Sequence, residues 1–157
     1  MIEPQDLQQH ALFGGLSDVG MAFVQSLFKS SSYSSGDMIV SEGERGNRMF
    51  FICCGNVEVI KKGPSNSYTR LATLHEGDSF GEMGLIDIQT RSASVRALDD
   101  LEVLTLRHQD MYAIFEQDKD TFILILMNIS REISRRLRKM DALVASSLYG
   151  KASSLAN

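Results

Sequence analysis

Apolar residues near the start of the chain recur at helical spacing. They predict N-terminal helices within residues 1–35, the second of which begins after Ser17, a residue type that caps helix N-termini. The apolar positions of that second helix are Met21, Phe23, Val24, Leu27 and Phe28. The serines at 30–32 and 34–35 favour a loop at the end of this block.

Residues 36–107 change to short runs of β-rich composition. The predicted strands are Met38–Val40, Met49–Cys54, Val57–Ile60, Tyr68–Leu74, Ser92–Leu98 and Leu101–Leu106. Turn residues separate them at Gly36-Asp37, Glu42-Gly43, Gly55-Asn56, Gly63-Pro64 and Gly77-Asp78. Strands at this regular spacing predict a mainly β fold, an antiparallel barrel or jelly roll, rather than alternating strands and helices.

Residues 108–149 return to helical spacing. A short helix over Gln109–Glu116 ends near Asp118, and a longer one runs roughly from Thr121 to Leu148. The apolar positions of the longer helix step by three or four: Phe122, Ile125, Ile129, Ile133, Leu137, Met140, Val144 and Leu148. We expect its first half to pack on the barrel and its second half to pair with a twin chain. Residues 1–150 then form one domain, and 151–157 a short frayed tail.

Composition narrows the classes of protein. The formal net charge of −4 argues against a general nucleic-acid or membrane-surface binder, which is normally basic. The first ten residues carry no basic stretch, and no window approaches 18 uninterrupted apolar residues, so we expect neither a secretory signal nor a membrane span. Cys53 and Cys54 point to opposite faces of a strand and do not easily pair, which fits small buried hydrophobes in a reducing compartment. The expected location is the cytoplasm.

Residues 77–97 hold the candidate chemistry. Gly81 lets the backbone approach a ligand closely, and Glu82–Ile86 can form one helical turn whose free N–H groups attract a phosphate. Arg91 can grip two phosphate oxygens, and Ser92 can add a hydroxyl. The Glu82 carboxylate needs a donor instead, and a sugar hydroxyl is the obvious one.

This segment resembles the phosphate-binding cassette of the cyclic nucleotide-binding domain family, in its stand-alone bacterial type. The matching residues are Phe80-Gly81-Glu82, Leu85 and Arg91-Ser92-Ala93-Ser94-Val95-Arg96-Ala97, with loop glycines at 36, 43, 55 and 77. The resemblance covers about residues 10–145. It implies a double-stranded β-helix of about eight strands, with helices before it and two after it, the last one long. Thr90 stands where many members have proline, which leaves that loop less stiff but removes no ligand contact.

The resemblance also implies a role for each matching residue. Glu82 would accept the ribose 2′-hydroxyl, and Arg91 would pair with the cyclic phosphate. The phosphate cradle would be completed by Gly81, Met83, Ser92 and Ala93, and the walls would be Leu71, Leu74 and Val95. A match of Arg135-Arg136-Leu137 to bacterial cyclic-AMP regulators would place Met140 and Asp141 near the base.

Cyclic AMP is the expected ligand, with cyclic GMP open. In the family, threonine at the Ser92 position favours cyclic GMP and alanine favours cyclic AMP, whereas serine occurs in bacterial cyclic-AMP regulators but keeps a hydroxyl. The expected function is that of a sensor that moves its C-terminal helices when the ligand binds. We expect no cofactor, no metal, a homodimer through the long helix, and an unidentified protein partner.

Other interpretations of the same residues stay open. The cassette glycines can be plain turn residues, Arg91 can form a surface ion pair with Asp87, and the domain can dimerise without a ligand. The basic residues of the long helix can line its solvent side: Arg131, Arg135, Arg136, Arg138 and Lys139. A hydrolase is disfavoured, since the three histidines show no metal-ligand spacing and Ser92 has none nearby in sequence. Only about a dozen residues follow Val144, so a DNA-reading domain would require that the chain is a fragment.

Overall fold

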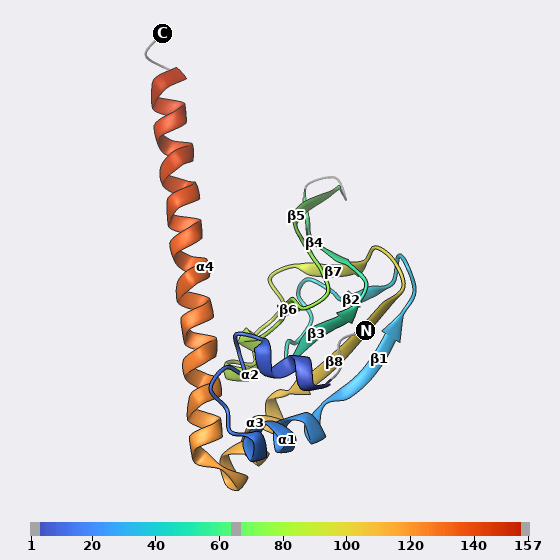
Figure 1. Cartoon of the computed structure of the whole chain (residues 1–157). Coiled ribbons are helices and arrows are strands. Elements are labelled where there is room, and N and C mark those ends of the chain that lie inside the picture. Colours follow the sequence, from blue (N-terminus) through green and yellow to red (C-terminus); the bar gives the residue numbers. More distant parts are fainter. Residues whose placement is uncertain (1–3, 64–66, 155–157) are drawn as a thin grey trace.

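The computed structural model describes residues 4–63 and 67–154, which form a β-roll flanked by helices (Figure 1). The strands are β1 (Lys29–Tyr33), β2 (Met38–Val40), β3 (Arg48–Cys54), β4 (Val57–Lys62), β5 (Tyr68–Leu74), β6 (Ser79–Phe80), β7 (Ser94–Ala97) and β8 (Leu101–Arg107). The helices are the 3-10 helix η1 (Pro4–Gln9), α1 (Asp18–Leu27), α2 (Met83–Ile86), α3 (His108–Gln117) and α4 (Lys119–Ser154).

The roll consists of two antiparallel four-stranded sheets. One has the order β1-β8-β3-β6 and the other β2-β7-β4-β5. The predicted fold class, mainly β with about eight strands and flanking helices, is therefore confirmed. The six predicted strands all occur, with ends that differ by a few residues at most.

Strand β3 is buried on both faces, which explains its unbroken apolar sequence. Phe50 and Ile52 point into the roll, where the Phe50 ring stacks on Phe80 at 4.8 Å between centroids. Met49 and Phe51 point the other way, into a second core shared with the helices. That second core includes the buried residues Leu12, Phe13, Met111, Ile114, Ile125 and Ile129. One strand thus separates the roll interior from the helical layer.

The expected loop at the serine run is wrong, because residues 30–32 belong to strand β1. Lys29–Tyr33 pairs with Thr105–Leu101 of β8 and lies at the edge of its sheet. The backbone ladder to β8 makes the strand, and the serine side chains point mostly into solvent, so no apolar pattern marks it.

Of two smaller predictions, one is confirmed and the other is only half right. The Ser17 N-cap is confirmed, since its hydroxyl accepts a hydrogen bond from the Gly20 amide at 3.1 Å. Cys53 is buried, and burial raises the pKa of its thiol. Cys54 is exposed, which corrects the expectation that both are buried, because alternate residues of β3 face opposite sides and Cys54 stands at the strand end.

Helix α4 divides into two halves. Thr121, Ile125, Asn128 and Ile129 are buried against the body of the protein. Asn128 donates hydrogen bonds to the carbonyl oxygens of Leu12 and Gly14 at 3.2 and 2.9 Å, which ties this half to the N-terminal segment. The second half stands clear of the roll and continues as helix through Ser154, beyond its predicted end near Leu148 (Figure 1). Residues 155–157 of the expected tail lie outside the described residues.

Glu58 of β4 should make the stability of the fold sensitive to acid. Arg70 donates to its carboxylate at 2.6 Å and Arg96 at 2.8 Å; the Arg96 bond, followed by the Arg70 bond, lowers the pKa of this buried group from 4.5. A carboxyl whose pKa is lower in the folded state adds stability above its unfolded pKa and loses it as the pH falls toward the folded pKa. Urea unfolding between about pH 7 and about pH 3.5 should therefore show a shallower loss of unfolding free energy in Glu58→Gln than in wild type. Glu76→Gln, at an exposed carboxylate, is the control, and equal slopes for all three proteins would contradict the expectation.

Candidate functional site

The site begins at a turn that only glycine allows. Gly81 follows β6 and has a φ of 76°, in the left-handed region. A Cβ atom there would lie 2.5 Å from Nη1 of Arg91 and 3.0 Å from the carbonyl oxygen of Arg48. The predicted single helical turn follows as α2, with Glu82 at its N-cap position and no capping hydrogen bond from the Glu82 side chain. The turn therefore brings the Glu82 backbone and the Arg91 guanidinium to the same place.

Arg91 is half-buried and makes its hydrogen bonds to main-chain oxygens. Its Nη2 donates to the Arg48 carbonyl at 2.7 Å and its Nη1 to the Gly81 carbonyl at 3.5 Å. Burial lowers the pKa of the guanidinium from its ordinary value; Arg48 adds to the effect, while Glu44 and Glu82 oppose it. Across the described residues Arg91 has no ion pair, so the alternative of a surface pair with Asp87 is wrong for this structure. A partly desolvated cation without a carboxylate is suited to an anionic ligand.

Glu82 is buried, with 2% of its surface exposed. Nη1 of Arg136, on α4, donates to its Oε1 at 2.7 Å. Its Oε2 is buried and, like Nε of Arg91, has no hydrogen-bond partner among the described residues. A buried carboxylate oxygen without a donor is costly, so it is a natural acceptor for a ligand hydroxyl.

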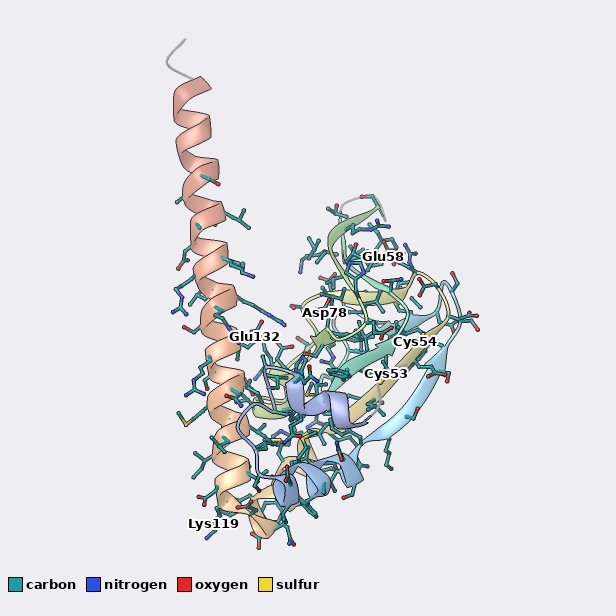
Figure 2. All side chains as sticks on the ribbon, in the orientation of Figure 1. Cys53, Cys54, Glu58, Asp78, Lys119 and Glu132 are labelled. Atoms are coloured by element: carbon teal, nitrogen blue, oxygen red, sulfur yellow. The ribbon has the colours of Figure 1, made fainter. Side chains whose placement is uncertain are left out.

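An alternating chain of charges continues from Glu82 along α4. Nε of Arg136 lies 3.1 Å from Oε1 of Glu132, and Oε2 of Glu132 lies 2.8 Å from Nη2 of Arg135. Figure 2 places Glu132 on the stretch of α4 that runs beside the roll. Arg136 therefore does not line the solvent side of the helix with the other basic residues, as the sequence interpretation had it. It is the contact between α4 and the cassette.

The remaining cassette residues surround this centre with different exposure. Met83, at the first position of α2, is 61% exposed. Ser92 is exposed and Ala93 half-buried, and the Ser92 carbonyl accepts a hydrogen bond from Nζ of Lys61 at 2.7 Å. Ser92 thus differs from the buried Ser94, whose hydroxyl accepts a hydrogen bond from the Glu42 amide.

The three expected wall residues lie on β5 and β7, the two strands that flank β4 in one sheet. Leu74 of β5 and Val95 of β7 pack in the roll interior. Leu71, also on β5, is 56% exposed. Of the three, Leu71 is thus the one that offers exposed apolar surface, while Val95 is buried and Leu74 partly buried in the roll.

Asp141 and Met140 are not brought to the cassette in this arrangement. Both are exposed on the second half of α4, Met140 at 62%. Beyond Arg136 the helix leaves the roll, and the side-chain hydrogen bonds of Arg138 and Ser146 stay within α4. Helical spacing alone does not predict the residue at which a helix stops packing against the roll.

Sequence reasoning missed Gly46 and the role of Arg136. A Cβ at Gly46 would lie 2.9 Å from Nε of Arg91, so this glycine also makes room for the guanidinium. A signal for Arg136 did exist: a buried glutamate requires a cationic or donor partner, and a cluster of arginines on the closing helix can supply one.

No described helix is long and apolar enough to cross a membrane. No group of three or more His, Cys, Asp or Glu among the described side chains is placed to hold a metal ion.

The fold and the cassette together define a class: a β-roll domain with a candidate anion site at a one-turn helix. The family model of the cyclic nucleotide-binding domain matches residues 30–118. This chain therefore belongs to the cyclic nucleotide-binding domain family. The matched family is named for a ligand-binding domain, and the match covers no enzymatic domain.

Individual relatives agree with this assignment. The chain is 32% identical over 130 residues to the cyclic AMP receptor protein of Thermus thermophilus, a match that spans 83% of this chain and 58% of that protein. It is 42% identical over 86 residues to a cGMP-dependent protein kinase of Toxoplasma gondii, which is 55% of this chain and 8% of the kinase. The crystal structure of the Thermus thermophilus catabolite activator protein superposes with a TM-score of 0.76 at 30% identity, over 86% of this chain and 62% of that one. The chain thus spans less than two thirds of each of these relatives.

Proposed function

We propose that the protein is a sensor that binds a 3′,5′-cyclic nucleotide at residues 80–97 and passes the binding event to α4. The observation that carries the proposal is the pair of buried, unpartnered atoms, Oε2 of Glu82 and Nε of Arg91. One is an acceptor that lacks a donor, and the other belongs to a cation that lacks an anion. A ribose hydroxyl and a phosphate on one ligand would satisfy both residues.

Each cassette residue has a role in this proposal. Arg91 pairs with the cyclic phosphate, and Gly81, Met83, Ser92 and Ala93 form the rest of the cradle with backbone amides and the Ser92 hydroxyl. The ribose 2′-hydroxyl donates to Oε2 of Glu82, while Oε1 keeps its bond to Arg136. The apolar walls are Leu71, Leu74 and Val95.

Cyclic AMP is the proposed ligand, with cyclic GMP as the alternative. The relatives carry both names, a cyclic AMP receptor protein and a cGMP-dependent kinase. Ser92 stands at a position where the side chain influences base preference in the family. Its serine is compatible with either nucleotide. Met140 and Asp141 are proposed to approach the base when α4 closes over the cassette.

The coupling to α4 runs through the Glu82–Arg136 contact. Arg136 is the side chain through which α4 bonds the cassette glutamate. A ligand hydroxyl that donates to the free oxygen of Glu82 therefore changes how strongly the Glu82 carboxylate attracts Arg136. The ligand can shift α4 only by as much as it binds one arrangement better than the other. The ion pairs that run from the Glu82 carboxylate through Arg136 to Glu132 and Arg135 are the physical route for that difference.

The second half of α4 is proposed to pair with a second copy of the chain. Leu137, Met140 and Val144 form an apolar seam at coiled-coil spacing, and each is more than half exposed. We propose a homodimer through this seam, signalling to a protein partner rather than to DNA by the chain itself. The competing function is a scaffold of the same fold that dimerises without ligand, which the exposed seam also supports.

Calorimetric titration of the purified protein with cyclic AMP, cyclic GMP and 5′-AMP tests the proposal. We expect micromolar or tighter binding of cyclic AMP, weaker binding of cyclic GMP and no heat with 5′-AMP, whose open phosphate differs in charge and shape. Light scattering on the same samples should give twice the mass of one chain. Absence of heat with every nucleotide, together with a dimeric mass, would favour the scaffold instead.

A further inference from the structure

One face of α4 is basic and takes no part in the proposed nucleotide site or dimer seam. Arg131, Arg135 and Arg138 follow one another at helical positions i, i+4 and i+7, and Lys139 flanks them. All four side chains are exposed. Residues two apart in a helix point about 200° apart, so Arg138 lies on the opposite side of the helix from Met140 in the seam. Dimerisation through the seam would leave the basic face open.

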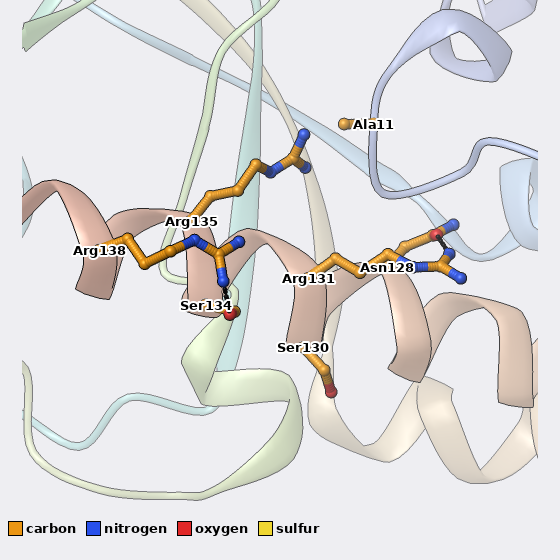
Figure 3. A pocket seen from close by; sticks show the side chains of 7 residues that line it. All are labelled: Ala11, Asn128, Ser130, Arg131, Ser134, Arg135 and Arg138. Carbon is orange, nitrogen blue, oxygen red and sulfur yellow. Dashed lines mark hydrogen bonds between the residues drawn. The ribbon is translucent and has the colours of Figure 1, made fainter.

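The three arginines line a groove between α4 and the N-terminal segment. The groove has a volume of about 560 Å³, and Ala11 of the N-terminal segment and Asn128, Ser130 and Ser134 of α4 form the rest of it. Figure 3 shows the arginines along one side of α4, with Ala11 on the neighbouring segment. Small side chains between the arginines leave room for an extended or helical segment to lie against the helix.

The cations of this groove are incompletely neutralised. Arg131 donates to Oδ1 of Asn128 at 2.9 Å and Arg138 to Oγ of Ser134 at 2.9 Å, both neutral oxygens. Among the described residues, neither of these arginines has a carboxylate within ion-pair distance. Arg135 pairs with Glu132, which is itself shared with Arg136. Three guanidiniums thus face one groove with a single, shared carboxylate.

We propose that this groove docks a carboxylate-rich segment of a partner protein. Guanidinium groups match carboxylates in two-point geometry, and the three arginines span about 10 Å along the helix, the length of two helical turns of a partner. A nucleic acid fits less well, because the chain has a net charge of −4 and the basic face is short, with Asp141 at one end. Charge complementarity thus selects an acidic polypeptide.

Docking is linked to the cassette through Arg135, a step that rests on the proposed nucleotide function. A partner carboxylate on Arg135 releases Glu132, which then holds Arg136 more closely. Arg136 in turn holds Glu82 less closely, so the Glu82 carboxylate is freer for the ribose hydroxyl. The partner should therefore raise the affinity for cyclic AMP, and by reciprocity cyclic AMP should raise the affinity for the partner.

A labelled peptide of glutamates tests the docking groove by fluorescence anisotropy, with a single-stranded oligothymidylate of equal charge as the competing probe. We expect Arg131→Gln with Arg138→Gln to weaken peptide binding about tenfold. The control is Lys29→Gln with Lys62→Gln, which removes the same charge from exposed strand positions and should leave binding unchanged. Equal losses in both double variants, or tighter binding of the oligonucleotide than of the peptide, would overturn the docking proposal.

Repeating the titration with cyclic AMP tests the link. Wild type should bind the peptide several-fold more tightly with saturating cyclic AMP, and Glu132→Gln should abolish that difference while it retains peptide binding. Unchanged peptide affinity with bound cyclic AMP overturns the link and leaves the groove standing. Peptide binding without any cyclic AMP binding would instead overturn the proposed nucleotide function alone, so the two failures are distinguishable.

Discussion

Replacing Arg91 by alanine should lower the affinity for cyclic AMP by roughly 100- to 10,000-fold without a matching loss of stability. Two charge-assisted hydrogen bonds to one phosphate are worth about 3–6 kcal/mol together, and each 1.4 kcal/mol is a factor of about ten. The substitution removes a half-buried cation that has no carboxylate partner among the described residues, so it leaves no unpaired charge behind. Calorimetric titration and thermal unfolding of the same samples measure the two effects separately.

The Arg91 experiment has two matched controls. Arg45→Ala removes a positive charge from an exposed residue whose backbone pairs with Thr90, and we expect its affinity to stay near that of wild type. Arg91→Lys keeps the charge but loses the two-point geometry, so an intermediate affinity is expected. Wild-type affinity in Arg91→Ala would show that the cassette has been assigned to the wrong residues.

Replacing Arg136 by glutamine should destabilise the fold more than replacing Glu82 by glutamine. Arg136→Gln leaves the carboxylate of Glu82, 2% exposed, without its cation, at a cost of about 1–3 kcal/mol. That corresponds to a loss of roughly 2–12 °C in Tm for a chain of this size. Glu82→Gln leaves a neutral amide that still accepts from Arg136, whose own side chain is 47% exposed, so a smaller shift is expected.

The loss of nucleotide affinity should be larger in Glu82→Gln than in Arg136→Gln, which is the opposite of the order expected for stability. Glu82→Gln weakens the acceptor for the ribose hydroxyl directly, whereas Arg136→Gln leaves that carboxylate in place. Arg138→Gln, at an arginine that bonds only the neutral Ser134 in the described structure, is the control for loss of charge on α4. Indistinguishable Tm values for Arg136→Gln and Arg138→Gln would mean that the contact to Glu82 carries no weight in solution.

The sequence pattern predicted those strands and turns whose conformation depends on neighbouring residues. The run Met49–Cys54 and the turn Glu82–Ile86 were found because an apolar strand and a glycine-led helical turn are visible within a few residues. Strand β1 was missed because its partner β8 lies some seventy residues away in the chain, and only that pairing makes the serines a strand.

The candidate site also has a part that a local pattern predicts and a part that depends on distant contacts. Gly81, Glu82 and Arg91 lie close in sequence, and the pattern that joins them is local. The Arg136–Glu82 contact is not local, because it depends on the rotation of α4 about its axis and on where that helix touches the roll. Asp141 was placed near the base through the likeness of Arg135-Arg136-Leu137 to bacterial regulators, whereas the structure has α4 standing clear of the roll there (Figure 1).

The hydrogen bonds of Asn128 make α4 a lever with a fixed pivot. Its side chain fastens the helix to the carbonyls of Leu12 and Gly14, while the helix continues from there to Ser154, a length of about 39 Å at 1.5 Å per residue. A tilt of about 10° at this pivot moves the far end of the helix by about 7 Å, by the same arithmetic. At the same tilt Arg136, about 12 Å from the pivot, moves by about 2 Å and Val144 of the seam by about 4 Å, so a shift beside the cassette is roughly doubled at the seam. Amplification of this kind needs a stiff helix and a firm anchor, and it needs no rearrangement inside the roll.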